Sequence, residues 1–180
     1  MEAIIGVIGT ILGTILGWML NSISNHGKLN VYISSWKDNF EYNETGCMAP
    51  SLSKEQTESY SYQLTLDLYN SSGEAKIMRN IAIIYSDDKC ELHKSVPKDD
   101  NTMRHSGPVR FYNDIVPMNI PPKTIIQLNL HDGSWHQNGE LDYIWKTKKI
   151  YVTYIDEKNK TKKVAIKSED YNCYFENRKQ

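Results

Sequence analysis

The residues that could bind a metal ion are a few cysteines and histidines. Cys90 and His93 are separated by two residues and His105 lies further on, while His131 and His136 form a second group. Zinc sites need such ligands in two closely spaced pairs. Neither group supplies two pairs, so the spacing predicts solvated loop histidines. We expect no metal and no other cofactor.

The acidic and nucleophilic residues form no recognisable catalytic motif. The sequence contains neither a G-x-S-x-G elbow nor a Gly-rich phosphate loop. Asp87-Asp88 and Asp99-Asp100 are paired carboxylates, but adjacent strand residues point to opposite faces of a sheet. Acidic pairs are also common in turns, so we expect solvated turns at both places. The sequence therefore predicts a protein that is not an enzyme.

A lysine-rich segment near the C-terminus could contact anionic lipid headgroups, since each lysine at a membrane surface contributes about 1 kcal/mol. Edge strands also carry lysines that prevent pairing with another sheet, and this interpretation is favoured because it needs no partner. The 21 basic residues are balanced by 22 acidic ones, so no nucleic-acid partner is expected. The candidate basic surface consists of Lys158, Lys160, Lys162 and Lys163.

An apolar stretch near the N-terminus determines where the rest of the chain lies relative to a membrane. Residues 3–20 contain no charged side chain, and a helix of that length is about 27 Å long, close to the hydrocarbon thickness of a bilayer. No positive charge precedes the stretch and no small-x-small cleavage site follows it, so a retained anchor is favoured over a signal peptide. We predict a transmembrane anchor with a polar exit at residues 1–27, followed by one domain at residues 28–180.

Small residues recur along one face of this predicted helix. Gly9, Gly13 and Gly17 are spaced four apart, in the small-xxx-small pattern that lets helix backbones approach closely in lipid. Glycine is also simply tolerated in membrane helices. A role of the three glycines in helix packing and their simple tolerance in a membrane helix are therefore about equally favoured.

The orientation of the anchor follows from its flanks. Lys28 and Lys37 follow the apolar stretch, and no Lys or Arg precedes it, so the positive-inside rule predicts an external N-terminus and a cytoplasmic C-terminal domain. Cys47, Cys90 and Cys173 are odd in number, as expected for reduced thiols.

The predicted domain shows the period-two hydrophobicity of β-strands. In residues 59–70, the clearest case, five apolar or aromatic side chains share one face. Further strands are predicted at residues 28–36, 76–86, 109–112, 124–130, 149–155 and 161–167, with a short continuation of the third at 90–93, and long loops are predicted at 38–57 and 131–142. The shared face of the clearest strand consists of Tyr60, Tyr62, Leu64, Leu66 and Leu68.

About seven strands, with no apolar period of 3.6 in the domain, predict an all-β fold. The expected architecture is an immunoglobulin-like antiparallel β-sandwich preceded by one transmembrane α-helix. Several tyrosines could build a binding face but are expected to pack this sandwich instead. They are Tyr112, Tyr143, Tyr151, Tyr154, Tyr171 and Tyr174.

Four segments carry a resemblance to a known group of proteins. They are NSSG at 70–73, RNIAII at 79–84, NIPPKTIIQLNL at 119–130 and KIYVTYID at 149–156. Together they resemble small immunoglobulin-like β-sandwich proteins of low-GC Gram-positive bacteria and their mobile elements, some of which carry an N-terminal anchor. The resemblance implies the fold and membrane attachment only.

These patterns favour a single-pass membrane-anchored binding protein with a non-catalytic, cytoplasmic domain. Its expected partners are the lipid bilayer, an unidentified protein and, through the glycine stripe, a second copy or a partner helix. One alternative is an oligomerising membrane-active effector, such as a phage-defence protein or toxin, that forms a pore or lesion and uses the β-domain as a sensor. A second alternative, with reversed topology, is an extracellular envelope or adhesion module.

Overall fold

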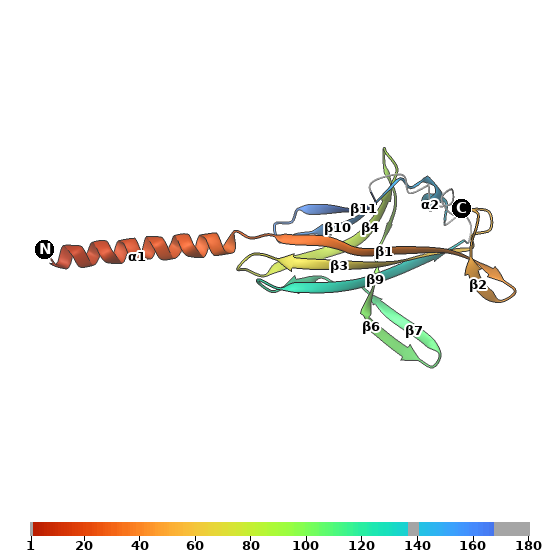
Figure 1. Ribbon diagram of the computed structural model, residues 1–180, viewed down its shortest axis with the longest axis horizontal. Helices are drawn as coiled ribbons and strands as arrows, with labels where there is room; N and C mark the ends of the chain where they lie inside the picture. Colours follow the sequence, from red (N-terminus) through yellow and green to blue (C-terminus); the bar gives the residue numbers. More distant parts are fainter. Residues whose placement is uncertain (1, 137–140, 168–180) are drawn as a thin grey trace.

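The computed structural model describes residues 2–136 and 141–167 and divides them into an N-terminal helix and a β-sandwich (Figure 1). The helix α1, Glu2–Asn25, projects from one end of the sandwich. Its apolar stretch Ile5–Ile23 has a mean hydropathy of 1.5, and none of it is buried in the protein. The predicted apolar helix is therefore confirmed, and its length and composition are consistent with a signal anchor or a signal peptide.

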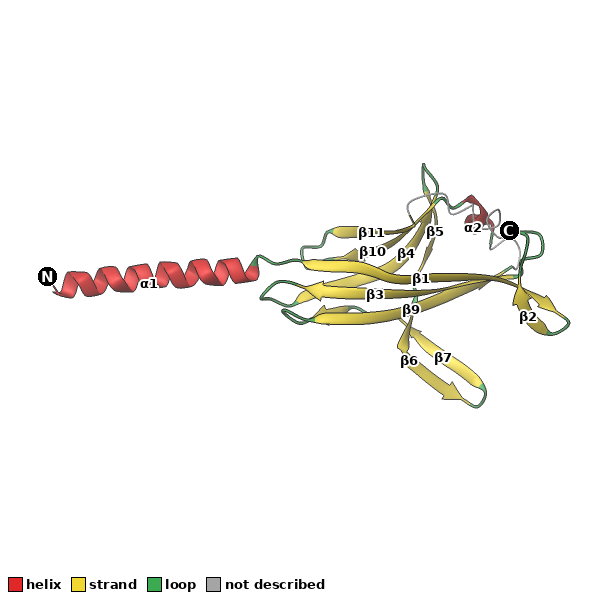
Figure 2. Ribbon diagram, viewed as in Figure 1, coloured by secondary structure: helices red, strands yellow, loops and turns green. Residues whose placement is uncertain are grey.

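The sandwich consists of two antiparallel sheets, as predicted (Figure 2). The larger sheet has the order β2-β1-β3-β9-β6-β7, and the smaller has the order β11-β10-β4-β5, with β8 paired to β4. The strands are β1 Leu29–Glu44, β2 Cys47–Pro50, β3 Ser59–Asn70, β4 Lys76–Ser86, β5 Glu91–Ser95, β6 Lys98–Ser106, β7 Val109–Asp114, β8 Met118–Ile120, β9 Ile125–Trp135, β10 Lys149–Ile155 and β11 Thr161–Lys167, and a short helix α2, Asp142–Lys146, precedes β10.

The core lies between the two sheets, and β3 supplies much of it. The predicted inner face of β3 is confirmed, because none of its five side chains is more than 2% exposed. Across the core they meet the inner faces of β4 and β10, including Met78, Ile83 and Val152, which are fully buried. Burial of this apolar surface is the main driving force for folding of the sandwich.

A layer of aromatic rings crosses the core near the end of the sandwich that is remote from α1. The ring of Tyr85 on β4 meets Tyr60 on β3 edge-on, with centroids 6.2 Å apart, and meets Tyr143 in α2 edge-on at 5.0 Å. Phe40 on β1 extends the layer, with its ring centroid 5.0 Å from that of Tyr60. Of the tyrosines predicted to pack the sandwich, Tyr143 packs against the core in this layer and Tyr154 is buried in the core. Tyr171 and Tyr174 lie outside the described residues.

The predicted loop at 38–57 is confirmed only over 51–57, because its earlier part contains the second half of β1 and all of β2. A β-bulge between Ile33 and Ser35 shifts the register of β1 against β3. Before the bulge, odd-numbered residues such as Ile33 pack on the core; after it, even-numbered residues such as Trp36 and Phe40 do. A bulge reverses which face each residue occupies, so the period-two pattern is broken although the strand continues.

Three other expectations also need correction. The predicted loop at 131–142 contains the end of β9, which pairs with β3 as far as Trp135, and the start of α2. The residues around 90–93 do not continue β4; most of them form β5, which folds back antiparallel on it. The strand predicted at 109–112 is confirmed within β7, but its partner β6 was missed because it is almost entirely polar. The count of eleven strands among the described residues therefore exceeds the predicted seven.

Candidate functional site

The connection between α1 and the sandwich is short and fixed. Only His26, Gly27 and Lys28 separate Asn25 from the start of β1. The backbone N–H and the hydroxyl of Ser71, in the β3–β4 turn, both donate to the Lys28 carbonyl oxygen, at 3.0 and 2.9 Å, and the Lys28 N–H lies 3.0 Å from the Ser71 hydroxyl oxygen. The helix is therefore held to the end of the sandwich rather than joined by a loose linker.

Gly27 makes this contact possible. A Cβ atom on Gly27 would lie only 2.2 Å from the backbone carbon and oxygen of Ser71. We expect Gly27→Ala to break the three hydrogen bonds between Lys28 and Ser71 while leaving the core folded. Each bond contributes about 1 kcal/mol, so amide hydrogen exchange around Lys28 should become about tenfold faster or more. Gly6→Ala is the matched control, since nothing lies within 4 Å of its added Cβ; equal exchange in both variants would contradict the fixed connection.

Asn70 holds the β3–β4 turn in place. It is fully buried, and its Nδ2 amide donates to the carbonyl oxygens of Glu74, Ile120 and Pro121 at 2.8, 3.0 and 3.0 Å. Its Oδ1 accepts from the backbone N–H and the hydroxyl of Ser72. One side chain thus ties together the two turns at the end of the sandwich where α1 leaves.

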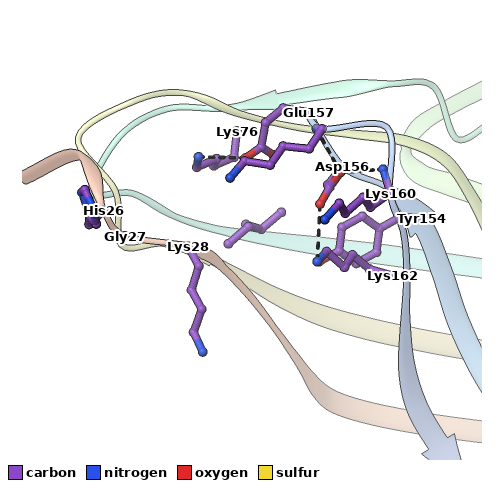
Figure 3. Close-up of a pocket in the computed structure, with 11 residues that line it drawn as sticks. His26, Gly27, Lys28, Lys76, Tyr154, Asp156, Glu157, Lys160 and Lys162 are labelled. Atoms are coloured by element: carbon purple, nitrogen blue, oxygen red, sulfur yellow. Dashed lines mark hydrogen bonds and ion pairs between the residues drawn. The ribbon is translucent and has the colours of Figure 1, made fainter. Parts of the chain in front are cut away.

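A cavity of about 410 Å³ lies beside this connection (Figure 3). Segments far apart in the sequence line it: the helix exit, the start of β4, and the β10–β11 turn with the first residues of β11. The charged residues of its lining are Lys28, Lys76, Asp156, Glu157, Lys158, Lys160 and Lys162. Five lysines against two carboxylates leave the lining with a net charge of +3, counting His26 as neutral.

Both carboxylates of the cavity are already engaged. Asp156 is 8% exposed, and its Oδ1 accepts from the backbone N–H groups of Lys160 and Lys158 at 2.8 and 3.0 Å. The bond from Lys160 is the main reason why the pKa of Asp156 is lowered, and the ammonium of Lys162, at 3.4 Å, acts in the same direction. Burial raises the pKa of Glu157, but the hydrogen bond from Lys76 at 2.8 Å, a backbone hydrogen bond and the charge of Lys76 together outweigh burial, so this pKa is also lowered. Both groups are therefore ionised at neutral pH.

The other three lysines of the cavity keep their charge available. Lys28, Lys158 and Lys160 are exposed, and none of their ammonium groups forms an ion pair with residues 2–136 or 141–167. In the lining of the cavity, two lysines therefore neutralise the two carboxylates, and the positive charges of the other three lysines face solvent.

The structure places most of the predicted basic surface here, with one exception. Lys158, Lys160 and Lys162 line the cavity. Lys163 does not, because neighbouring strand residues point to opposite faces, and its ammonium lies 3.7 Å from the centroid of the Tyr151 ring. Lys28 and Lys76 join the cavity although they were not part of the predicted surface.

The glycines of the predicted stripe lie along α1. Nothing in the described chain comes within 4 Å of where a Cβ on Gly9, Gly13 or Gly17 would be. The hydroxyls of Thr10 and Thr14 beside them bond back to carbonyls of the same helix, Gly6 O and Thr10 O, at 2.9 Å. Their role in helix packing stays a prediction.

Most of the other candidates for chemistry are dispersed, but His131 of β9 bonds through Nδ1 to the carboxylate of Asp100 in β6. His93 lies in β5, with its ring centroid 4.0 Å from that of Tyr143. The prediction of solvated loop histidines is therefore wrong for these two residues. Asp87 accepts the N–H groups of Lys89 and Cys90 in the β4–β5 turn, as expected, whereas Asp99 lies inside β6 and pairs with Leu130 of β9, so the turn predicted there is wrong. Within residues 2–136 and 141–167, no three Cys, His, Asp or Glu side chains gather as metal ligands would. Asp132 is half-buried, and burial raises its pKa.

Two solved structures are similar at low identity: a protein assigned as ApaA from Bordetella pertussis (12% identity, 79% of this chain and 90% of that chain, TM-score 0.36) and a structural genomics target solved by X-ray crystallography (14% identity, 77% and 82%, TM-score 0.37). None of the curated proteins compared with the chain matches it significantly.

The sandwich itself gives the decisive match. Residues 27–167, from the helix exit to the end of β11, match the family model of the YopI Ig-like domain. The immunoglobulin-like part of the resemblance drawn from the sequence is thereby confirmed, and its link to low-GC Gram-positive bacteria stays a prediction. The chain belongs to the YopI Ig-like domain family.

Proposed function

We propose that the chain is a single-pass membrane-anchored binding protein whose Ig-like domain sits on the cytoplasmic surface of the bilayer and acts without catalysis. The observation that carries the proposal is the connection at Gly27. It fixes an apolar helix, with no buried residue in its Ile5–Ile23 stretch, directly to the basic end of the sandwich. With the helix in a bilayer, that end of the domain necessarily faces the headgroups.

The distribution of charge along the domain supports the orientation. Lys28, Lys158 and Lys160 lie at the end next to α1, and Lys123 joins them there, with its ammonium 2.7 Å from the Ser71 carbonyl oxygen. β2 lies at the opposite end of the sandwich (Figure 1). The residues around it are acidic and include Glu41, Glu44, Glu55 and Glu58. The cytoplasmic leaflet carries anionic lipids, so this polarity favours a domain that stands on that leaflet with its acidic end away from it.

The acidic end offers a surface for the bound partner. Met48, Leu52 and Trp135 lie there with 40%, 71% and 57% of their surface exposed. Exposed apolar side chains rimmed by charge are typical of protein interaction surfaces. We therefore expect the partner to be a protein that approaches from the cytoplasm.

A C-terminal epitope tag tests the location. In cells that express the full chain, the tag should resist added protease while the cells are intact and should be digested once the membrane is permeabilised. The chain should stay in the membrane fraction at its full mass, because the helix is retained. Digestion in intact cells would favour the extracellular envelope or adhesion module, and a shortened chain in the soluble fraction would mean that the helix is a cleaved signal peptide.

The glycine stripe supports the alternative of an oligomerising effector, because no described residue of the sandwich covers that face of α1. The two functions predict different effects of overexpression on growth. An effector that forms pores or lesions arrests growth, and Gly13→Leu relieves the arrest. Growth that is unaffected by overexpression of the full chain would count against it.

A further inference from the structure

We propose that the cavity beside the α1 exit binds the phosphate group of an anionic phospholipid headgroup. The proposal rests on the proposed function in one respect: α1 must lie in a bilayer. A bound headgroup would add a contact between the Ig-like domain and the bilayer, beyond the attachment through α1. It would thereby fix the rotational orientation of the domain relative to the membrane.

The position of the cavity fits a headgroup. The apolar stretch of α1 ends at Ile23, and the cavity lining begins at His26 and continues to Leu29. At 1.5 Å per helical residue, the lining starts about 5 Å beyond the apolar stretch. The headgroup layer on each side of a bilayer is about 5–8 Å thick. With α1 in a bilayer, the first lining residues therefore lie at the depth of the lipid phosphates.

The charge of the cavity fits a phosphate. Lys76 and Lys162 neutralise Glu157 and Asp156, so an arriving anion meets no uncompensated carboxylate. Lys158 and Lys160 of the β10–β11 turn remain to bind it. Lys28 of the helix exit adds its charge at the rim of the cavity, with its side chain directed away from Lys160 and Lys162 (Figure 3). Lysine ammonium groups are common ligands of phosphate. A volume of about 410 Å³ also falls in the range of small-molecule sites.

Edge protection does not explain these three lysines. That interpretation applies to side chains on the edge strand β11, Thr161–Lys167, and so to Lys162 and Lys163. Lys158 and Lys160 lie in the turn before β11, and Lys28 lies on the helix exit. The side-chain amines of the three make no hydrogen bond or ion pair with the described residues, so their charges are not needed to hold the fold together.

The test measures lipid binding by the full chain in neutral detergent micelles, with native mass spectrometry counting bound lipids. One phosphatidylglycerol per chain should bind in preference to phosphatidylcholine. The triple variant Lys28→Gln, Lys158→Gln, Lys160→Gln should bind phosphatidylglycerol about a hundredfold more weakly, since each lysine contributes about fivefold. The matched control is Lys37→Gln, Lys89→Gln, Lys94→Gln, which removes three exposed charges elsewhere on the sandwich and should change binding less than twofold.

Each other outcome is decisive. Equal weakening in the two triple variants would overturn the site, because it would show a general charge effect. Equal binding of the two lipids by the wild-type chain would overturn it as well. Inorganic phosphate that binds as tightly as the lipid and displaces it would assign the cavity to a soluble anion instead. Micelles impose no sidedness, so failure here is distinguishable from failure of the epitope-tag experiment.

Discussion

Asn70→Asp should destabilise the sandwich by about 3–5 kcal/mol, because it places an unpaired negative charge in a fully buried position. The native amide donates to three carbonyl oxygens within 3.0 Å. An aspartate presents oxygen to the same three carbonyls and cannot donate while it is ionised. The loss falls on the β3–β4 turn, which also carries the hydrogen bonds to Lys28, so the connection to α1 should loosen as well.

The pH dependence of this variant distinguishes charge from shape. Burial raises the pKa of the introduced carboxyl in the folded state, so folding binds a proton and stability rises as the pH falls toward the unfolded value. Part of the loss should therefore be recovered at acidic pH relative to wild type. Urea unfolding of the full chain in neutral detergent, followed by tryptophan fluorescence at several pH values, measures both effects. Asn101→Asp, at an exposed position on β6, is the control; comparable losses in the two variants would show that Asn70 is not a structural link.

Strands whose buried side chains alternate without interruption could be predicted from the sequence. In β3 the inner residues from Tyr60 to Leu68 all stay on one face, and β10 and β11 begin and end where their patterns predict. Strands that continue beyond their last apolar residues could not be predicted in full from the sequence. The last residues of β9, including His131 and Asp132, are polar, yet they extend the strand because β3 supplies backbone partners as far as Ser59. Hydrogen bonds to a neighbour, rather than hydropathy, set the length of such strands.

The candidate site was accessible from the sequence only in part. The lysines at 158, 160 and 162 could be found because they lie close together in the chain. Their meeting with Lys28 and Lys76 depends on the strand order: β4 is antiparallel to β10, so Lys76, which begins β4, lies near the turn that ends β10. The helix exit reaches the same end through the pairing of Leu29 with Asn70. Neither pairing can be inferred from the hydrophobic period or the charge of the sequence. The meeting of these segments at one cavity could therefore be seen only in the structure.

The aromatic layer leads to the second large effect: Tyr85→Ala should destabilise the sandwich by about 3–5 kcal/mol, whereas Tyr85→Phe should cost only about 1 kcal/mol. Tyr85 is fully buried, and its ring links the two sheets and α2 through Tyr60 and Tyr143. Its hydroxyl contributes one hydrogen bond, to the Tyr60 hydroxyl at 3.3 Å. Alanine removes the whole ring and leaves a cavity between the layers, while phenylalanine keeps the ring and removes only this hydrogen bond.

Urea unfolding of the full chain in neutral detergent measures this pair of variants. The midpoint should fall far more for Tyr85→Ala than for Tyr85→Phe, at an unchanged denaturant slope. Similar losses would mean that the hydroxyl pair, rather than packing of the rings, joins the sheets there. The distinction bears on function, because this layer lies beneath the end of the domain where we place the protein partner. A rigid layer of rings would hold that surface in shape, and the same variants should then weaken partner binding in proportion to the packing they remove.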